Sequence, residues 1–393
     1  MQAPEIFILS ARRTAIGTFG GALKDVPLCD LATTAVKAAL VDSHVEAERI
    51  GHVVMGNVIA TEPKDAYLAR VAAINAGIPK ETPAYNVNRL CGSGLQAIIS
   101  AAHTLQLGDA DFAIGGGAES MSRGPYLLPS ARWGARMGDA QVQDYMLGIL
   151  HDPFHGIHMG ITAENVAQRN HISREAQDAL AFTDQQRAAH AIAQGYFAAQ
   201  IAAVEVPGRK GTSLFNVDEH PRATTLEQLA QMKPAFKKDG TVTAGNASGL
   251  NDGAAALVLA SGDAVRTANL TPMARLVAYA HAGVEPELMG LGPIPATRLA
   301  LKRAGLRIGD MDVIEANIAF AAQACAVMEE LEFDPARLNP NGSGIALGHP
   351  VGATGAIIAT KALHELHRIK GRYALATMCI GGGQGIAVIF ERV

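Results

Sequence analysis

Hydrophobic residues in this chain form short apolar runs separated by longer amphipathic stretches. The runs that would suit buried strands are Ile6–Leu9, Val53–Met55, Ala113–Ile114, Leu276–Tyr279, Val313–Ile314 and Ala374–Met378. The stretches between them have the length and polarity of surface helices. Strands that alternate with helices along a chain are typical of α/β layers, so the pattern predicts an α/β fold.

Two of the amphipathic stretches follow glycine-rich turns and carry apolar residues at the spacing i, i+3, i+4 and i+7. These positions are Leu95, Ile98, Ile99 and Ala102 in one stretch, and Ala359, Ala362, Leu363 and Leu366 in the other. This spacing places the apolar side chains on one face of a helix. The sequence therefore predicts two similar helices far apart in the chain.

Further similarities recur at a separation of about 260 residues. Paired landmarks are Arg49-Ile50-Gly51 with Arg307-Ile308-Gly309, Asn57 with Asn317, Ala97 with Ala356, and the run Ile114-Gly-Gly-Gly with Ile380-Gly-Gly-Gly. Because the landmarks keep the same order, we interpret them as two homologous halves. In each half, a helix is expected to lead to a strand that ends in a run of glycines.

An insertion separates the two halves. We expect residues 1–120 together with 251–270 to form the N-terminal half, and residues 271–393 to form the C-terminal half. The intervening residues 121–250 include the helical stretch Arg174–Ala193 and several connections rich in Pro, Lys and Gly. An inserted segment of this kind is expected to cover a substrate, although a merely decorative insertion would share its pattern.

Composition narrows the class of protein. The chain has 393 residues, of which 49% are hydrophobic, and a formal net charge of −4, so it should fold compactly and lacks the basic character of a nucleic-acid-binding protein. The four cysteines form no C-x-x-C pair, which argues against a disulfide framework. With no secretory leader or long apolar segment visible, we expect a cytoplasmic protein without a membrane association.

Cys91 is the first candidate for chemistry. It stands in the run Asn88-Arg-Leu-Cys-Gly-Ser-Gly94, where a glycine-rich turn meets an apolar helix. The free N–H groups of a helix N-terminus stabilise a thiolate, and flanking glycines let a substrate approach the backbone. A buried, unreactive cysteine is the alternative.

His349 occupies the corresponding turn of the second half, in the run Gly348-His-Pro-Val-Gly-Ala-Thr-Gly355. If the halves pack about a pseudo-twofold axis, Cys91 and His349 should face one another. A cysteine beside a histidine is an established way to make a nucleophile at neutral pH. A structural histidine at a helix start is the alternative.

Cys379 is the third candidate, at the end of an apolar run and before Gly381. A thiol at this position could donate and accept a proton. The glycines do not match the dinucleotide-binding pattern G-x-G-x-x-G, which disfavours a dehydrogenase.

Other residues with reactive side chains are expected to have structural roles. His151, His155 and His158 lie close together in the chain, but intervening Pro and Gly residues spoil a single helical face, so we expect no metal site there. Cys29 and Cys325 stand in helical contexts rich in Leu and Ala and are expected in the core.

Several of these motifs together resemble the thiolase family, in particular the short-chain β-ketothiolases, or acetyl-CoA acetyltransferases. They are Asn88–Gly94, the run Gly-Gly-Gly-Ala-Glu-Ser-Met121, Asn246–Gly253, Gly348–Gly355 and Cys379 with its glycines. The likeness extends over nearly the whole chain. It implies a five-layer αβαβα fold of two similar halves with a loop domain between them, and assembly as a homotetramer.

The resemblance also implies roles for the candidate residues. Cys91 resembles the nucleophile that accepts the acyl group, His349 the base that activates it, and Cys379 the second acid and base. Asn317 resembles the residue that holds a water, which together with His349 forms one oxyanion hole. The backbone N–H groups of Cys91 and Gly381 resemble the other oxyanion hole.

The family likeness further implies that coenzyme A and acyl-CoA bind as substrates and that no cofactor is tightly held. The residues that match coenzyme A contacts are Leu150, His158, Met159, Arg222, Ala244, Ser248 and Phe320. Arg222 would face the nucleotide end and Ser248 the pantetheine amide. Leu90 and Met289 would limit the length of the acyl chain, which is expected to be short.

One position departs from the family pattern. This chain reads Asn317-Ile-Ala-Phe320, with Ile318 where the family usually has Glu. We expect Ile318 beside the substrate pocket, and the loss of the carboxylate leaves a second interpretation open, a protein that binds acyl-CoA but turns over weakly. A decarboxylating condensing enzyme is disfavoured, because such relatives generally carry His at the position of Cys379.

Overall fold

The computed structural model describes residues 4–208 and 211–393. The segments before residue 121 and after residue 250 form two units of similar construction. The elements of the first unit are β1 (Ile6–Thr14), β2 (Gly17–Thr18), α1 (Leu28–Ser43), β3 (Ile50–Gly56), α2 (Leu68–Asn75), β4 (Ala84–Val87), α3 (Ser93–Gln106), β5 (Phe112–Ser120), β11 (Asn251–Ser261) and α8 (Gly262–Thr267). Those of the second are β12 (Ala274–Gly283), α9 (Pro293–Ala304), β13 (Val313–Ala316), α10 (Ala321–Glu330), α11 (Gly344–Leu347), α12 (Val351–Arg368), β14 (Tyr373–Ile380) and β15 (Gln384–Arg392).

The strand order shows that the second unit repeats the first. One sheet runs β13-β14-β15-β12-β1-β11-β5-β3-β4, so the order outward from its centre is the same on both sides apart from the additional β4. The directions match as well: β3 and β5 are parallel, as are β13 and β14, and the other pairs in this comparison are antiparallel. The units join where β1 pairs antiparallel with β12. The two homologous halves expected from the sequence are therefore present.

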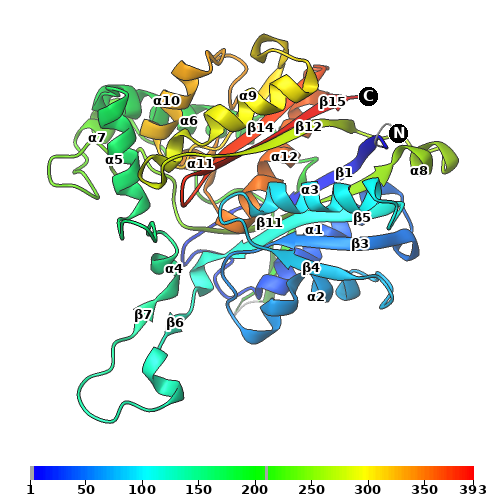
Figure 1. The fold of residues 1–393 in the computed structure, drawn as a ribbon, viewed down its shortest axis with the longest axis horizontal. Coiled ribbons are helices and arrows are strands. Elements are labelled where there is room, and N and C mark those ends of the chain that lie inside the picture. The colour runs from blue at the N-terminus through cyan, green and yellow to red at the C-terminus, as the bar shows by residue number, and fades with distance from the viewer. Residues whose placement is uncertain (1–3, 209–210) are drawn as a thin grey trace.

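Helices cover both faces of each half, which gives five layers (Figure 1). Apolar residues of α1 and α2 pack on β3, β5 and β11, and those of α9 pack on β12 to β15. Between the halves, α3 and α12 share one apolar cluster that also draws residues from both parts of the sheet. The αβαβα fold predicted from the sequence is confirmed.

Two glycines allow the central helices to cross closely. A β-carbon added to Gly94 of α3 would lie 2.5 Å from the backbone nitrogen of Ala356 in α12. A β-carbon on Gly355 would lie 2.3 Å from the backbone nitrogen of Leu95. Because backbone atoms cannot move aside, only glycine fits at these points. The start of each helix is thereby held against its counterpart.

The glycine runs of the two halves are not equivalent, contrary to the sequence interpretation. Gly115, Gly116 and Gly117 lie inside β5, whereas Gly381 and the glycines after it follow the end of β14. Inside β5, a β-carbon on Gly115 would lie 2.6 Å from the α-carbon of Ile98 in α3. The first run therefore serves close helix packing, and the second forms a turn with positive φ angles.

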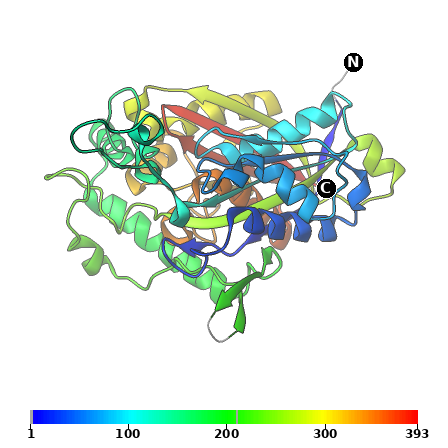
Figure 2. The same cartoon turned by 90° about the horizontal axis from the view of Figure 1, so that it is seen from below.

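The inserted residues add further helices and strands to the two halves. They are β6 (Tyr126–Leu127), β7 (Gln143–Asp144), α4 (Tyr145–Gly148), α5 (Met159–Arg169), α6 (Arg174–Ala193), β8 (Ile201–Ala202), β9 (Val204–Gly208), β10 (Gly211–Phe215) and α7 (Leu226–Ala230). The segment between β6 and β7 extends away from the body in Figure 1, and the β9–β10 hairpin projects in Figure 2. The predicted limits of the loop domain remain a prediction. Within the described residues, no helix is both long and apolar enough to cross a membrane.

Candidate active site

A single large cavity brings together residues from both halves and from the insertion. Its volume is about 720 Å³. The predicted site residues on its wall are Leu90, Cys91, Leu150, His158, Met159, Arg222, Ala244, Ser248, Met289, Phe320, His349, Cys379 and Gly381. Side chains separated by hundreds of positions in the chain therefore share one space. Asn317 and Ile318 are the predicted site residues that do not line it.

Cys91 sits in a tight turn immediately before α3. The Ser93 hydroxyl donates to the carbonyl of Leu90 at 2.6 Å and accepts from the backbone N–H of Arg89 at 2.9 Å. Leu90 takes a φ angle of +47°, a conformation that L-residues rarely adopt. A β-carbon on Gly92 would lie 2.4 Å from the Ile380 side chain, so this turn packs directly on the end of β14.

Burial raises the pKa of the Cys91 thiol, while hydrogen bonds from the backbone N–H groups of Gly381 and of Cys91 itself act in the opposite direction. The carboxyl of Glu119 raises this pKa further through its charge. A thiol with a raised pKa is protonated at neutral pH and is a poor nucleophile by itself. Cys91 therefore needs a base.

His349 can act as such a base, because its hydrogen bonds select the tautomer. Its Nδ1 lies 2.6 Å from the hydroxyl oxygen of Thr354, and that hydroxyl donates its proton to the carbonyl of Pro350 at 2.9 Å. A hydroxyl carries only one proton, so it must accept from Nδ1–H. The Nε2 atom is then left without a proton. Burial lowers the pKa of His349 to about 4, which keeps the ring neutral.

The backbone at His349 is fixed by Asn251 of β11. The Asn251 side chain accepts from the backbone N–H of His349 at 2.9 Å and donates to the carbonyl of Gly17 at 2.9 Å. Gly348 has a φ angle of +104°. A β-carbon there would lie 2.5 Å from the Asn251 side chain. The glycine before the histidine thus lets a strand of the other half hold the turn.

Cys379 lies at the end of β14 and is 1% exposed. It belongs to an apolar cluster with Met159, Met289 and Phe320. Burial raises the pKa of its thiol, the charge of Cys91 raises it further, and both cysteines line the same cavity. Cys379 can therefore carry a proton into an apolar space beside Cys91.

Asn317 and Ile318 follow the end of β13 and are not among the residues that line the cavity. Both amide atoms of Asn317 are buried and have no hydrogen-bond partner in the described part of the chain. Ile318 is 1% exposed and packs in a cluster with Ala181, Leu229 and Ile345. Ile318 was expected beside the substrate pocket. It does not line the cavity itself, but its cluster partners Leu229 and Ile345 do, so it lies directly behind the cavity wall.

The predicted coenzyme A contacts other than Phe320 lie on the part of the cavity wall that the insertion contributes. His158 begins α5, where its Nδ1 accepts from the backbone N–H of Gly160 at 3.0 Å. Its ring stacks on Phe236 with centroids 4.7 Å apart. The neighbouring histidines also have protein partners: His151 contacts the carbonyl of Leu147, and His155 the carboxylate of Asp152.

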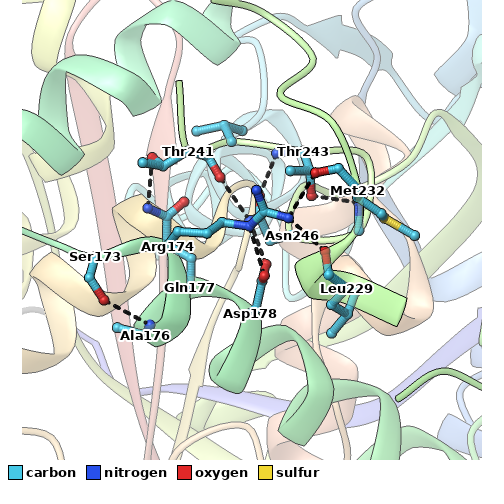
Figure 3. A network of polar contacts seen from close by, with 12 residues as sticks. Ser173, Arg174, Ala176, Gln177, Asp178, Leu229, Met232, Thr241, Thr243 and Asn246 are labelled. Carbon is cyan, nitrogen blue, oxygen red and sulfur yellow. Dashed lines mark hydrogen bonds and ion pairs between the residues drawn. The ribbon is translucent and has the colours of Figure 1, made fainter. Parts of the chain in front are cut away.

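A polar network behind this wall holds the segment that carries Ala244 and Ser248 (Figure 3). Asp178 of α6 accepts from the Asn246 side chain at 2.9 Å and pairs with Arg174 at 2.7 Å. The same guanidinium donates to the carbonyl of Leu229 at 2.6 Å. The backbone carbonyl of Asn246 in turn accepts from Ala321 at 2.8 Å. Helix α6 therefore braces the cavity wall against α10.

Sequence reasoning missed several residues that support the site. Thr354 and Asn251 both lie in motifs that we singled out, but no role was assigned to them. Glu119 also lies in a motif that we singled out, and it too was given no role. Its carboxylate accepts from the N–H groups of Val58, Ile59 and Gly352 and from the Asn57 amide. Burial raises the pKa of Glu119 to about 8. Only its presence in a glycine-rich motif could have drawn attention to it.

Comparison with known proteins agrees with this geometry. Residues 6–263 match the thiolase N-terminal domain and residues 270–392 the thiolase C-terminal domain. The chain is 62% identical to beta-ketothiolase BktB of Cupriavidus necator, over 99% of both chains. It is 48% identical to acetyl-CoA acetyltransferase of Pseudomonas aeruginosa, again over 99% of each. A crystal structure of human mitochondrial 3-ketoacyl-CoA thiolase in complex with CoA matches with a TM-score of 0.96 and 47% identity, covering 99% of this chain and 98% of that one.

The fold and these relatives define an acyltransferase built from two homologous halves, with the Cys91 thiol of one half and the His349 imidazole of the other on the wall of one cavity. The chain belongs to the thiolase family.

Proposed function

We propose that this protein is a β-ketothiolase that cleaves short-chain 3-ketoacyl-CoA with coenzyme A and catalyses the reverse Claisen condensation of two acyl-CoA molecules. The observation that carries the proposal is the presence of Cys91, His349 and Cys379 on the wall of one cavity. Relatives that share most of the sequence are named beta-ketothiolase and acetyl-CoA acetyltransferase. No observation favours the alternative of an acyl-CoA-binding protein with weakened turnover.

In the first half-reaction of cleavage, Nε2 of His349 takes the proton of the Cys91 thiol. The Cys91 sulfur bonds to the 3-keto carbon of the substrate, and the bond between C2 and C3 then breaks. The electron pair stays on C2 of the departing acetyl-CoA, where the Cys379 thiol delivers a proton. The products are acetyl-CoA and an acyl group on Cys91.

In the second half-reaction, the Cys379 thiolate takes the proton of the incoming coenzyme A thiol. The sulfur of coenzyme A attacks the acyl carbon, and Cys91 leaves and recovers its proton from His349. The new acyl-CoA departs and both cysteines are again thiols. Each half-reaction needs only a nucleophile, one base and one acid, and the raised thiol pKa values keep both cysteines protonated at neutral pH in the resting enzyme.

Both half-reactions develop a negative oxygen that requires donors. The N–H groups of Cys91 and Gly381 form one oxyanion hole; they already donate toward the Cys91 sulfur. Asn317 holds a water, and this water and His349 form the other oxyanion hole. The buried amide of Asn317 supports this role, because a buried amide without a partner in the described residues needs a water or a ligand.

Coenzyme A lies along the wall formed by Leu150, His158, Met159, Arg222, Ala244, Ser248 and Phe320, which all line the cavity. Arg222 faces the nucleotide and Ser248 the pantetheine amide. Leu90 and Met289 close the acyl end and restrict it to short chains. No further cofactor is required, since two thiols and one imidazole supply every proton transfer.

The molecule assembles as a homotetramer in the cytoplasm. The segment between β6 and β7 supports assembly, because it extends from the body and exposes large apolar side chains: Trp133 is 87% exposed and Met137 96%. Exposed apolar groups of this size are typical of surfaces that contact another protein.

The direct test measures loss of acetoacetyl-CoA by the purified protein, with and without coenzyme A. We expect continuous loss only when coenzyme A is present. When acetoacetyl-CoA is supplied alone, we expect a single equivalent to be consumed and an acetyl group on Cys91 by mass spectrometry. Cys91→Ser should abolish both signals, whereas Cys29→Ser should retain them because Cys29 is on the buried face of α1. Absence of activity in the wild-type protein would overturn the proposal.

A further inference from the structure

Helix α6 carries a second buried carboxylate, Asp184, whose contacts lie away from the network in Figure 3. Asp184 is 2% exposed. One of its oxygens accepts from the backbone N–H of Ser343 at 2.7 Å, and the other accepts from the backbone N–H of Ala346 at 2.8 Å. Ser343 and Ala346 stand at the beginning of α11, the short helix that leads into His349.

These contacts supply what α11 lacks. The side chain of Ser343 precedes the helix but makes no capping hydrogen bond to it. A helix start leaves N–H groups without intrahelical partners, and a carboxylate satisfies them well. Asp184 therefore performs the capping that would normally come from a neighbouring residue, although it comes from the insertion.

Because Asp184 caps α11, the Ser343 side chain can instead hold the end of β13. Its hydroxyl donates to the carbonyl of Ala316 at 3.1 Å and accepts from the backbone N–H of Ile318 at 3.2 Å. These two residues flank Asn317. The Asp184 carboxylate thus fixes Ser343 through its N–H, and Ser343 fixes the turn that carries Asn317.

We propose that Asp184 is a positioning residue for the reaction: from the inserted helix α6 it fixes the backbone that places both His349 and Asn317. Asp184 touches neither substrate nor the reacting atoms. Its effect should appear in the chemical step, while Asp178 on the same helix should affect coenzyme A binding through Asn246. This inference rests on the proposed thiolase reaction.

The test compares Asp184→Asn with the wild-type protein. An amide oxygen can accept from only one of the two N–H groups, and the amide nitrogen then faces the other donor. We expect kcat for thiolysis of acetoacetyl-CoA to fall about tenfold or more, with KM for coenzyme A changed less than twofold. The rate of Cys91 alkylation by iodoacetamide at pH 7 should fall in the same direction, because His349 no longer lies correctly to take the proton.

Two further variants on α6 serve as controls. Asp178→Asn should raise KM for coenzyme A more than it lowers kcat. Arg187→Ala removes hydrogen bonds to the carbonyls of Pro335, Leu338 and Asn339, which also tie α6 to the C-terminal half but do not reach the His349 turn. It should lower the melting temperature and leave kcat within about twofold of the wild-type value.

The outcomes separate this inference from the proposed function. A wild-type protein without thiolase activity overturns the proposed function, and the alkylation rates still test Asp184. If Asp184→Asn keeps the wild-type kcat and alkylation rate, the inference about Asp184 is wrong and the proposed function stands. The same follows if Arg187→Ala lowers kcat as much as Asp184→Asn does when both variants lose the same melting temperature. If Asp184→Asn does not fold, Asp184→Glu replaces it: the charge remains but the longer side chain displaces α11, and an unchanged kcat contradicts the inference.

Discussion

Nδ1 of His349 lies 2.6 Å from the hydroxyl oxygen of Thr354, and this contact decides which ring nitrogen can accept a proton. The Thr354 hydroxyl donates a hydrogen bond to the carbonyl of Pro350, so the imidazole must donate from Nδ1–H and leave Nε2 unprotonated. A neutral histidine has two tautomers, and only one of them makes His349 a base for Cys91. The tautomer is therefore set by a residue on α12.

Replacing Thr354 with Val keeps the shape of the side chain and removes the acceptor. We expect kcat for thiolysis to fall about tenfold or more, since the other tautomer becomes accessible and Nδ1–H loses its partner. Thr360→Val is the matched control: Thr360 is also buried on α12, and its hydroxyl donates to the carbonyl of Ala356. Equal losses in the two variants would show that the effect is one of packing.

The low pKa of His349 predicts the acid side of the pH profile. An ordinary imidazole, with a pKa of about 6.5, is mostly protonated at pH 5.5 and cannot act as a base. Because burial lowers the pKa of His349 to about 4, its ring stays neutral there. The single-turnover rate of Cys91 acylation by acetoacetyl-CoA, measured without coenzyme A, should not fall between pH 7.5 and pH 5.5. A fall centred near pH 6.5 would contradict the assignment.

Gly348 should tolerate no side chain. Alanine at this position would meet the Asn251 side chain at 2.5 Å, in a backbone conformation with φ of +104° that only glycine adopts easily. We expect Gly348→Ala to lose at least about tenfold in kcat, because the His349 turn must move. Gly309→Ala is the control, since a β-carbon there meets no other atom within 4 Å. Comparable kcat values for Gly348→Ala and the wild type would show that the turn adapts.

A buried ion pair joins α12 to β13 away from the cavity. Lys361 lies 2.7 Å from Glu315, and their side chains are 3% and 0% exposed. Lys361→Met leaves the carboxylate buried without its cation, so we expect the free energy of unfolding to fall by about 3 kcal/mol. Urea denaturation measures this free energy of unfolding. The double variant with Glu315→Leu should recover most of the loss; if it is less stable than Lys361→Met, the pair is not the origin of the effect.

Ile318 should act on stability through its apolar contacts. Its side chain packs in an apolar cluster with Ala181, Leu229 and Ile345. Ile318→Ala should lower the free energy of unfolding by about 2–4 kcal/mol, because it removes buried surface and leaves a cavity. Urea denaturation and kcat are measured on the same preparation. A large loss of kcat with unchanged stability would place this side chain in the active site after all.

Much of the fold follows from local patterns in the sequence. The short apolar runs that begin at Ile6, Val53 and Ala374 all lie in strands, and the helix expected at Arg174–Ala193 spans those residues. Apolar periodicity reports which face of an element is buried, and burial is what drives the element to form. For the same reason, a shared pattern was sufficient to reveal the repeat.

The sequence also identified the groups capable of the chemistry, since a thiol or an imidazole has its reactivity wherever it lies. Cys91, His349 and Cys379 could be chosen from their residue types and the glycines around them, before their separation in space was known. The shared wall of one cavity is a tertiary fact. It depends on the packing of α3 against α12 across Gly94 and Gly355.

Only the tertiary structure decided how these groups are held. Asp184 is more than 150 positions from the helix that it caps, and no periodicity links the two. The side chain of Ile318 packs in an apolar cluster behind the cavity wall and does not line the cavity itself. Hydrogen bonds and side-chain directions of this kind arise between segments that meet only after folding, so a local pattern contains no trace of them. The sequence by itself determined the strands, the helices and the reactive groups. The packing of distant segments determined the tautomer of His349, the orientation of the reactive side chains and their access to the cavity.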